Sequence, residues 1–207
     1  MDYKTVSGTI NIATGLILGL VWLGIAAFLL LKKRKSLVHV LFFTIFYIYL
    51  YKVFDYTLFQ FQSLILLKHF VPGLMLNGLS AEKSVNLIPL ATLRLEDIKT
   101  SLLNVLLMIP FGFGLPFITS FSMKRVVAAG ALFSIVIELL QLITGFMANT
   151  TFRVADINDV IFNTAGVVIG SMIFVAFVRM YRQASRNWTM KEIPVLRYIA
   201  ERPQVDK

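Results

Sequence analysis

The residues of this chain that could do chemistry gather around one stretch, RVADINDVIFNTAGVVIG at 153–170. It sets an arginine, two aspartates and an asparagine at the start of a long apolar run. A helix would place five of its residues on one face, because they are spaced 3, 4, 3 and 4 apart: Asp156, Asp159, Asn163, Gly166 and Gly170. A membrane helix that begins with ionisable groups and continues with small residues is expected to face protein rather than lipid.

Further polar side chains interrupt the apolar segments that precede this stretch. Glu138 and Gln141 lie three residues apart inside one apolar run, and Asn104 opens another. A carboxylate inside such a run costs about 2.5–3.5 kcal/mol on insertion scales, so Glu138 needs a partner, a proton or water. The candidate ligand-binding residues are Asn86, Asn104, Glu138, Gln141, Arg153, Asp156, Asp159 and Asn163.

The composition indicates the environment in which these residues work. The chain has 207 residues, of which 57% are hydrophobic and 15% charged, whereas soluble domains are about 45–50% apolar and about 25% charged. The sequence therefore predicts an integral membrane protein. It contains no cysteine, which excludes disulfides and thiolate metal sites. Its net charge of +9 comes from basic residues at the ends of apolar runs, a pattern of membrane orientation rather than of nucleic-acid binding.

The predicted fold is all-α, a polytopic transmembrane helical bundle with about five spans. The apolar runs cover residues 11–31, 37–59, 101–121, 126–147 and 160–178. Basic residues follow the first, third and fifth runs, as KKRK at 32–35, Lys124–Arg125 and Arg179 onward. Because cytoplasmic ends are enriched in Lys and Arg, we expect the N-terminus outside and the C-terminus in the cytoplasm. Lys52 and Asp55 are expected to form an ion pair near the end of the second run.

The chain divides into four predicted parts: two N-terminal transmembrane helices at 1–60, an extracytoplasmic loop at 61–100, a core of three transmembrane helices within 84–175, and a basic cytoplasmic tail at 181–207. The loop contains an apolar piece, 70–79, that is too short to span and is open to two interpretations, re-entrant or interfacial. His69 stands alone, so no metal site and no cofactor are expected. The tail, with Trp188 and Tyr198, is expected to lie against the cytoplasmic leaflet. Pro194 and Pro203 argue against one long helix there.

Prolines and glycines mark the third span. Pro110, Gly112, Gly114 and Pro116 predict a kinked or broken helix, which is tolerated only where protein or water satisfies the freed backbone groups. Small residues also allow close helix packing. The candidate packing residues are Pro110, Gly112, Gly166 and Gly170.

The predicted topology brings the polar residues to one depth, near the outer leaflet. A structural interpretation stays open: Asp156 or Asn158 is a natural N-cap, Arg153 could neutralise Glu138 or an aspartate, and the amides could join helices. However, one arginine and three carboxylates exceed what capping requires, and ionisable residues inside membranes are functional candidates by default.

Several of these motifs together resemble the VanZ-like family of bacterial membrane proteins. They are NLIP at 86–89, Asn104 leading to PFGFGLP at 110–116, Glu138-x-x-Gln141, Arg153, and Asp156-x-x-Asp159-x-x-x-Asn163-x-x-Gly166. The resemblance covers about residues 84–175. Members often have NLIPF where this chain has Leu90, and Arg-Ser-x-Asp where it has Arg153-Val-Ala-Asp156. The resemblance implies a multi-pass protein of the bacterial cell membrane and a link to resistance against the glycopeptide antibiotic teicoplanin, but it implies no reaction.

Three functions follow from the cluster and the resemblance. The favoured one is a non-enzymatic envelope protein that binds a membrane lipid headgroup, a lipid-linked cell-wall precursor or a lipoglycopeptide antibiotic, with Arg153 engaging an anionic group. The alternative is a membrane enzyme acting on a lipid or polyprenyl phosphate, with Glu138, Asp156 and Asp159 holding Mg²⁺ or Glu138 transferring a proton. The third is a structural or transport-related component whose polar cluster only holds the bundle together.

Overall fold

The computed structural model of this chain describes residues 3–59, 85–90, 97–148, 155–185 and 193–202. Within these residues, five helices are long and apolar enough to cross a membrane, at Thr14–Lys32, Leu37–Leu58, Ile98–Ile118, Met123–Thr144 and Ile157–Ala184. They confirm the predicted all-α bundle with five spans. The orientation of the bundle across the membrane stays a prediction.

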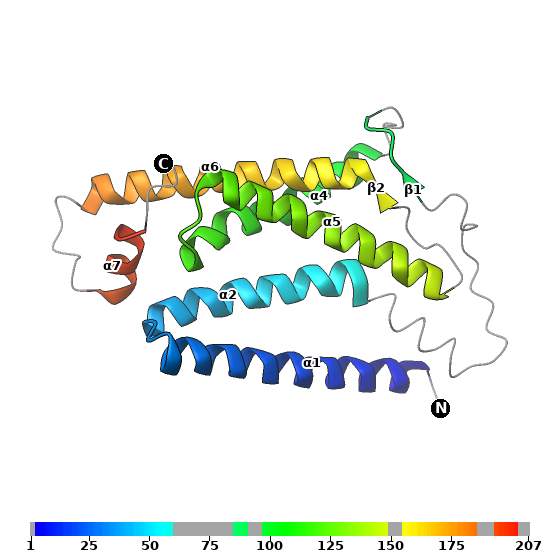
Figure 1. The fold of residues 1–207 in the computed structure, drawn as a ribbon, viewed down its shortest axis with the longest axis horizontal. Coiled ribbons are helices and arrows are strands. Elements are labelled where there is room, and N and C mark those ends of the chain that lie inside the picture. Colours follow the sequence, from blue (N-terminus) through cyan, green and yellow to red (C-terminus); the bar gives the residue numbers. More distant parts are fainter. Residues whose placement is uncertain (1–2, 60–84, 91–96, 149–154, 186–192, 203–207) are drawn as a thin grey trace.

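The helices lie roughly side by side along the long axis of the molecule (Figure 1). In chain order the elements are α1 (Tyr3–Ala27), α2 (Leu37–Phe54), β1 (Val85–Asn86), α4 (Asp97–Ile118), α5 (Met123–Ala148), β2 (Ala155–Asp156), α6 (Ile157–Ser185) and α7 (Pro194–Ala200), with π-helical turns at Phe28–Lys32 and Asp55–Phe59. The two short strands lie at one end of the bundle and α7 lies at the other (Figure 1). We call these the strand end and the α7 end. The predicted Lys52–Asp55 ion pair is present, with 3.4 Å between Nζ and Oδ2.

Helices α4 and α6 approach each other so closely that their backbones touch. A Cβ atom added at Gly112 of α4, or at Gly166 or Gly170 of α6, would lie 2.0–2.2 Å from a carbonyl oxygen of the other helix. Only glycine fits at such a distance. The small-residue face of α6 therefore meets α4, as the spacing predicts.

Proline has two different positions in α4, and neither breaks the helix, which is continuous through both Pro110 and Pro116. Of the two predicted alternatives, a kinked or a broken helix, the break is therefore not found, and the kink stays a prediction. Pro116 is buried, and its missing N–H leaves the Gly112 carbonyl without its helical donor. The Ser171 hydroxyl of α6 lies 3.5 Å from that carbonyl oxygen. Pro110 is exposed rather than a packing residue, because it lies two positions from Gly112 and so on the opposite face of the helix.

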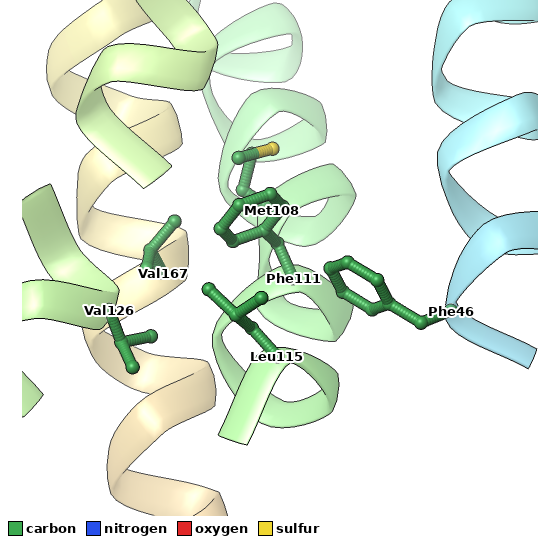
Figure 2. Packing of buried hydrophobic residues seen from close by; sticks show 6 residues of the cluster. All are labelled: Phe46, Met108, Phe111, Leu115, Val126 and Val167. Carbon is green, nitrogen blue, oxygen red and sulfur yellow. The ribbon is translucent and has the colours of Figure 1, made fainter. Parts of the chain in front are cut away.

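The hydrophobic core joins α2 to the three C-terminal spans. Figure 2 shows Phe46 of α2 directed at Phe111 of α4, with Val167 of α6 on the other side of α4. Other members of this buried cluster are Met108, Leu115 and Val126. The Phe46 and Phe111 ring centroids are 5.5 Å apart in a tilted arrangement that aromatic pairs favour. This contact attaches α2 to the core.

Helix α1 packs much more loosely than the other spans. Only 6% of the residues in its apolar window are buried, against 44% for α4. Its contacts with α2 include two hydrogen bonds, from Trp22 Nε1 to Thr44 Oγ1 at 3.1 Å and from the Tyr47 hydroxyl to the Leu18 carbonyl oxygen at 2.7 Å. Between Leu16 and Ile25, α1 exposes apolar side chains that suit contact with lipid.

The C-terminal helix α7 covers the end of α4. The expected position of this segment against the cytoplasmic leaflet stays a prediction. In the structure Tyr198 is buried, and its hydroxyl donates to the Phe117 carbonyl oxygen at 2.6 Å. The Arg202 guanidinium donates to the same oxygen at 2.9 Å, and His39 Nδ1 of α2 lies 2.7 Å from the Tyr198 hydroxyl. The last carbonyl groups of a helix have no helical partner, so these donors satisfy the C-terminus of α4.

Candidate functional site

The strand end of the bundle is built from segments far apart in sequence. Strand β1 pairs in parallel with β2, and Asn86 lies opposite Asp156. The Asn86 side chain also donates from Nδ2 to Asp156 Oδ1 at 3.0 Å. Because β2 leads directly into α6, this pair attaches the segment at 85–90 to the start of the last span (Figure 1).

Asp156 connects the start of α6 to the buried carboxylate of α5. Its Oδ1 accepts the backbone N–H of Asn158 at 2.8 Å, so Asp156 is the N-cap of α6. Its own backbone N–H donates to Glu138 Oε2 at 3.2 Å. Glu138 is only 8% exposed, and this bond supplies one donor that its carboxylate needs inside an apolar segment.

Asp159 lies one turn into α6 and faces α4. Its Oδ1 accepts from Asn104 Nδ2 at 2.6 Å, and Asn104 is buried. A carboxylate in the first turn of a helix is also stabilised by the positive end of the helix dipole. The pair therefore joins α4 and α6 on the strand-end side of their glycine contacts.

Gln141 and Asn163 extend the polar region in two directions. Gln141 Nε2 donates to the Thr57 carbonyl oxygen at 3.1 Å and so attaches α5 to the end of α2. Asn163 Nδ2 donates to Ser134 Oγ at 2.8 Å, one helical turn deeper than Asp159 and Glu138. Asn163 Oδ1 is buried and accepts no hydrogen bond from the described residues, although buried carbonyl oxygens normally receive a donor.

The sequence did not identify Asn158 as more than an N-cap candidate. In the structure it is buried, and its Oδ1 accepts the backbone N–H of Leu90 at 2.8 Å. Asn86 Oδ1 similarly accepts the N–H of Ile88 at 3.2 Å. The two asparagines thus shape the segment 86–90, in which Leu90 has a positive φ of 59°. A polar residue beside an N-cap was the only available signal for this role.

The structure therefore brings most of the predicted site residues together. Asn86, Asp156 and Glu138 are connected by hydrogen bonds at the strand end, and Asn104 pairs with Asp159 beside them. We call these five residues the polar set. Arg153 lies outside the described residues, as do His69 and the 70–79 segment. Ligand binding by the set stays a prediction.

Three carboxylates surround the first turn of α6 in this arrangement. Glu138, Asp156 and Asp159 each accept at least one hydrogen bond from an amide or a backbone N–H. Each ionised carboxylate has about four acceptor positions, so one carboxylate can accept several donors at once. In the described part of the chain, no group of three His, Cys, Asp or Glu side chains has an arrangement that could hold a metal ion.

The comparisons with known proteins agree with this description of the core. The family model VanZ/LLP1 matches residues 54–179, which is more than half of the chain and includes every candidate site residue. No curated protein and no solved structure matches the chain significantly. With five apolar helices, the chain is a multi-pass bacterial membrane protein, and it belongs to the VanZ/LLP1 family.

Proposed function

We propose that this protein binds an amphipathic ligand of the cell envelope at the strand end of the bundle and thereby lowers susceptibility to teicoplanin. The ligand would be a lipid headgroup, a lipid-linked cell-wall precursor or a lipidated glycopeptide. The observation that carries the proposal is the convergence of buried and half-buried polar side chains from β1, α4, α5, β2 and α6 at the ends of their spans. The distribution of basic residues favours the outer leaflet for this end.

The chemistry of the set fits the polar part of such a ligand. Glu138, Asp156 and Asp159 can accept from hydroxyl, amide or ammonium groups, and Arg153, three residues before Asp156, would supply a donor fork for a phosphate or carboxylate. Exposed apolar side chains of α4, such as Leu102 and Leu106, lie beneath this end and suit an acyl or prenyl chain. A site that places polar groups next to apolar helix faces favours a ligand with a polar head and an apolar chain.

The enzyme alternative finds less support. Mg²⁺ is held through carboxylate oxygens and water in near-octahedral geometry. Glu138, Asp156 and Asp159 form no such group among the described residues, and the oxygens named above accept N–H donors. The purely structural alternative requires only acceptors at these positions, so it predicts that neutral side chains of the same shape would serve as well as the three carboxylates.

The test removes the negative charge of Glu138 and keeps its hydrogen bond with the Asp156 N–H. Glu138→Gln retains a side-chain oxygen that can accept the Asp156 N–H, and its volume is almost unchanged. We would express wild type and variant in a sensitive Gram-positive host and measure the minimal inhibitory concentrations of teicoplanin and vancomycin, with the protein level in the membrane. We expect wild type to raise the teicoplanin value several-fold without changing the vancomycin value, and Glu138→Gln to lose this protection at a normal protein level.

The matched control is Asp55→Asn, which removes a carboxylate at the end of α2 outside the polar set. Asp55 is 43% exposed and paired with Lys52, so protection should persist. Full protection by Glu138→Gln would show that the charge is not needed. Loss of protection in proportion to loss of protein would favour the structural alternative, and no protection by wild type would refute the link to resistance.

A further inference from the structure

The segment Leu87–Leu90, which we call the apolar lip, exposes large apolar side chains beside the polar set. Leu87 is 73% exposed, Ile88 61% and Leu90 56%. Three consecutive or nearly consecutive apolar residues with this exposure are unusual in a loop that faces water. The exposure therefore needs an explanation.

The lip is attached directly to the end of a span. Its last residue, Leu90, donates its backbone N–H to Asn158, the second residue of α6, whose apolar span begins at Ile157. Its base, Asn86, is paired with Asp156 one residue before that span. The lip thus lies at the level where the bundle enters the membrane, at the strand end (Figure 1).

The backbone N–H groups of the lip have partners that suit surroundings with little water. The N–H of Ile88 donates to Asn86 Oδ1, the N–H of Leu90 donates to Asn158 Oδ1, and Pro89 has no N–H. Residues 88–90 therefore present no unsatisfied backbone donor. Because an unsatisfied N–H is strongly disfavoured where water is lacking, satisfied donors favour the entry of a loop into the leaflet. A loop that faces water has no need of such partners.

We propose that the apolar lip inserts into the leaflet at the strand end, with acyl chains of that leaflet around Leu87, Ile88 and Leu90. Its two asparagine anchors then hold the carboxylates of the polar set at the depth of the lipid headgroups. The same anchors hold Leu90 at its positive φ, so the shape of the lip is fixed before it meets lipid. The inference needs only the membrane position of the spans and does not depend on the ligand proposed above.

The absence of cysteine in the chain allows a direct test. Ile88→Cys would be labelled with the environment-sensitive fluorophore NBD and reconstituted into nanodiscs of phosphatidylcholine and phosphatidylglycerol, in which both faces meet the buffer. The hydrocarbon reference is Leu106→Cys, on an exposed position of α4, and the aqueous reference is Lys33→Cys, between α1 and α2. Quenching would be measured with a lipid that carries a doxyl group near its headgroup and with cobalt ions in the buffer.

We expect the label at position 88 to be quenched by the doxyl lipid and to be several-fold less accessible to cobalt than the label at position 33. Quenching by cobalt as strong as at position 33 would overturn the proposal. Shielding from both quenchers would overturn it too, because protein rather than lipid would then cover the lip. If Ile88→Cys fails to fold, Leu87→Cys provides the same measurement. The susceptibility of cells with Glu138→Gln is independent of these results, so the two proposals can fail separately.

Discussion

The two ends of the α4–α6 pair satisfy their helix termini with opposite chemistry. The strand end holds the N-terminus of each helix, and carboxylates and amides gather there, including Asp156, Asp159 and Asn104. The α7 end holds the C-terminus of each, and donors gather there, including Tyr198 and Arg202. This distribution follows the helix dipole, whose positive end attracts acids and whose negative end attracts cations.

The difference lies in what remains after capping. At the α7 end, Tyr198 and Arg202 donate to the Phe117 carbonyl and Arg182 donates to the carbonyl of Ala200, so each of these donors meets a backbone carbonyl. At the strand end, Asp156 caps α6, and Glu138 and Asp159 bring two more carboxylates to the same region. Capping explains the α7 end and does not explain the strand end. This surplus is why we propose binding at the strand end alone.

Both ends depend on the glycine contact between them, so its disruption should have the largest effect. In Gly170→Ala the new Cβ would lie 2.0 Å from the Ile109 carbonyl oxygen, and the helices must separate. We expect the free energy of unfolding to fall by about 1–3 kcal/mol, as for other overpacked cores. Thermal unfolding in detergent, followed by size-exclusion fluorescence, would measure this.

Gly19→Ala in α1 is the control, because nothing lies within 4 Å of its added Cβ. An equal loss of stability in the two variants would show that α4 and α6 do not depend on their close approach.

Tyr198→Phe tests the α7 end by itself, and its expected effect is smaller than that of Gly170→Ala. The ring can still stack on Phe42, whose centroid is 5.3 Å away, but the hydroxyl contacts with Phe117 and His39 are lost. We expect a loss of about 1 kcal/mol in unfolding free energy, since Arg202 still donates to the carbonyl. Teicoplanin protection per molecule in the membrane should be unchanged.

The matched variant is Tyr181→Phe, at the same end of the bundle, whose hydroxyl makes no hydrogen bond to the described residues. Its stability should stay near that of wild type. Loss of protection per molecule in Tyr198→Phe, at normal stability, would mean that the α7 end also takes part in function.

The smallest expected effect is a pH dependence at the α7 end. Burial raises the pKa of the Tyr198 phenol above its ordinary value of 10.0, although the nearby Arg202 charge opposes this. Its contribution to stability is therefore complete below pH 10 and decreases as pH rises toward the folded pKa, because the unfolded state then ionises first. The difference in unfolding temperature between wild type and Tyr198→Phe should stay constant from about pH 8 to about pH 10 and shrink above it. A constant difference up to about pH 11 would contradict the assignment.

The sequence predicted the spans well because apolar length determines them. The second run was expected at 37–59 and is found at Leu37–Leu58. The fifth was expected at 160–178 but extends over Ile157–Ala184. Its start agrees with the N-cap expected at Asp156 or Asn158. Its other end looked like a boundary at Arg179, yet the helix continues, and Arg182 donates to the Ala200 carbonyl. Tertiary partners that sequence alone does not show made the difference.

The sequence predicted that the site residues lie at one depth in the bundle, but not which of them form hydrogen bonds with each other. Equal depth follows from the topology, which placed Asn104, Glu138 and Asp159 together. Which groups bond depends on the rotation of each helix about its axis, so the Gln141–Thr57 and Asn163–Ser134 contacts could not be foreseen. The strand pair has only two residues in each strand, too few for any periodic pattern, and its register comes from contacts between segments about 70 residues apart.

The close contact between α4 and α6 has a consequence for biosynthesis. The ribosome completes α4 and α5 before α6 emerges, so α4 enters the bilayer without the helix that its Gly112 contacts. Until then, Asn104 lacks Asp159 and the Gly112 carbonyl lacks Ser171. The core cannot form until its last span, α6, has been made. A chain that ends before α6 exposes polar groups to lipid. The polar groups of α4 therefore gain these partners only when α6 has been translated.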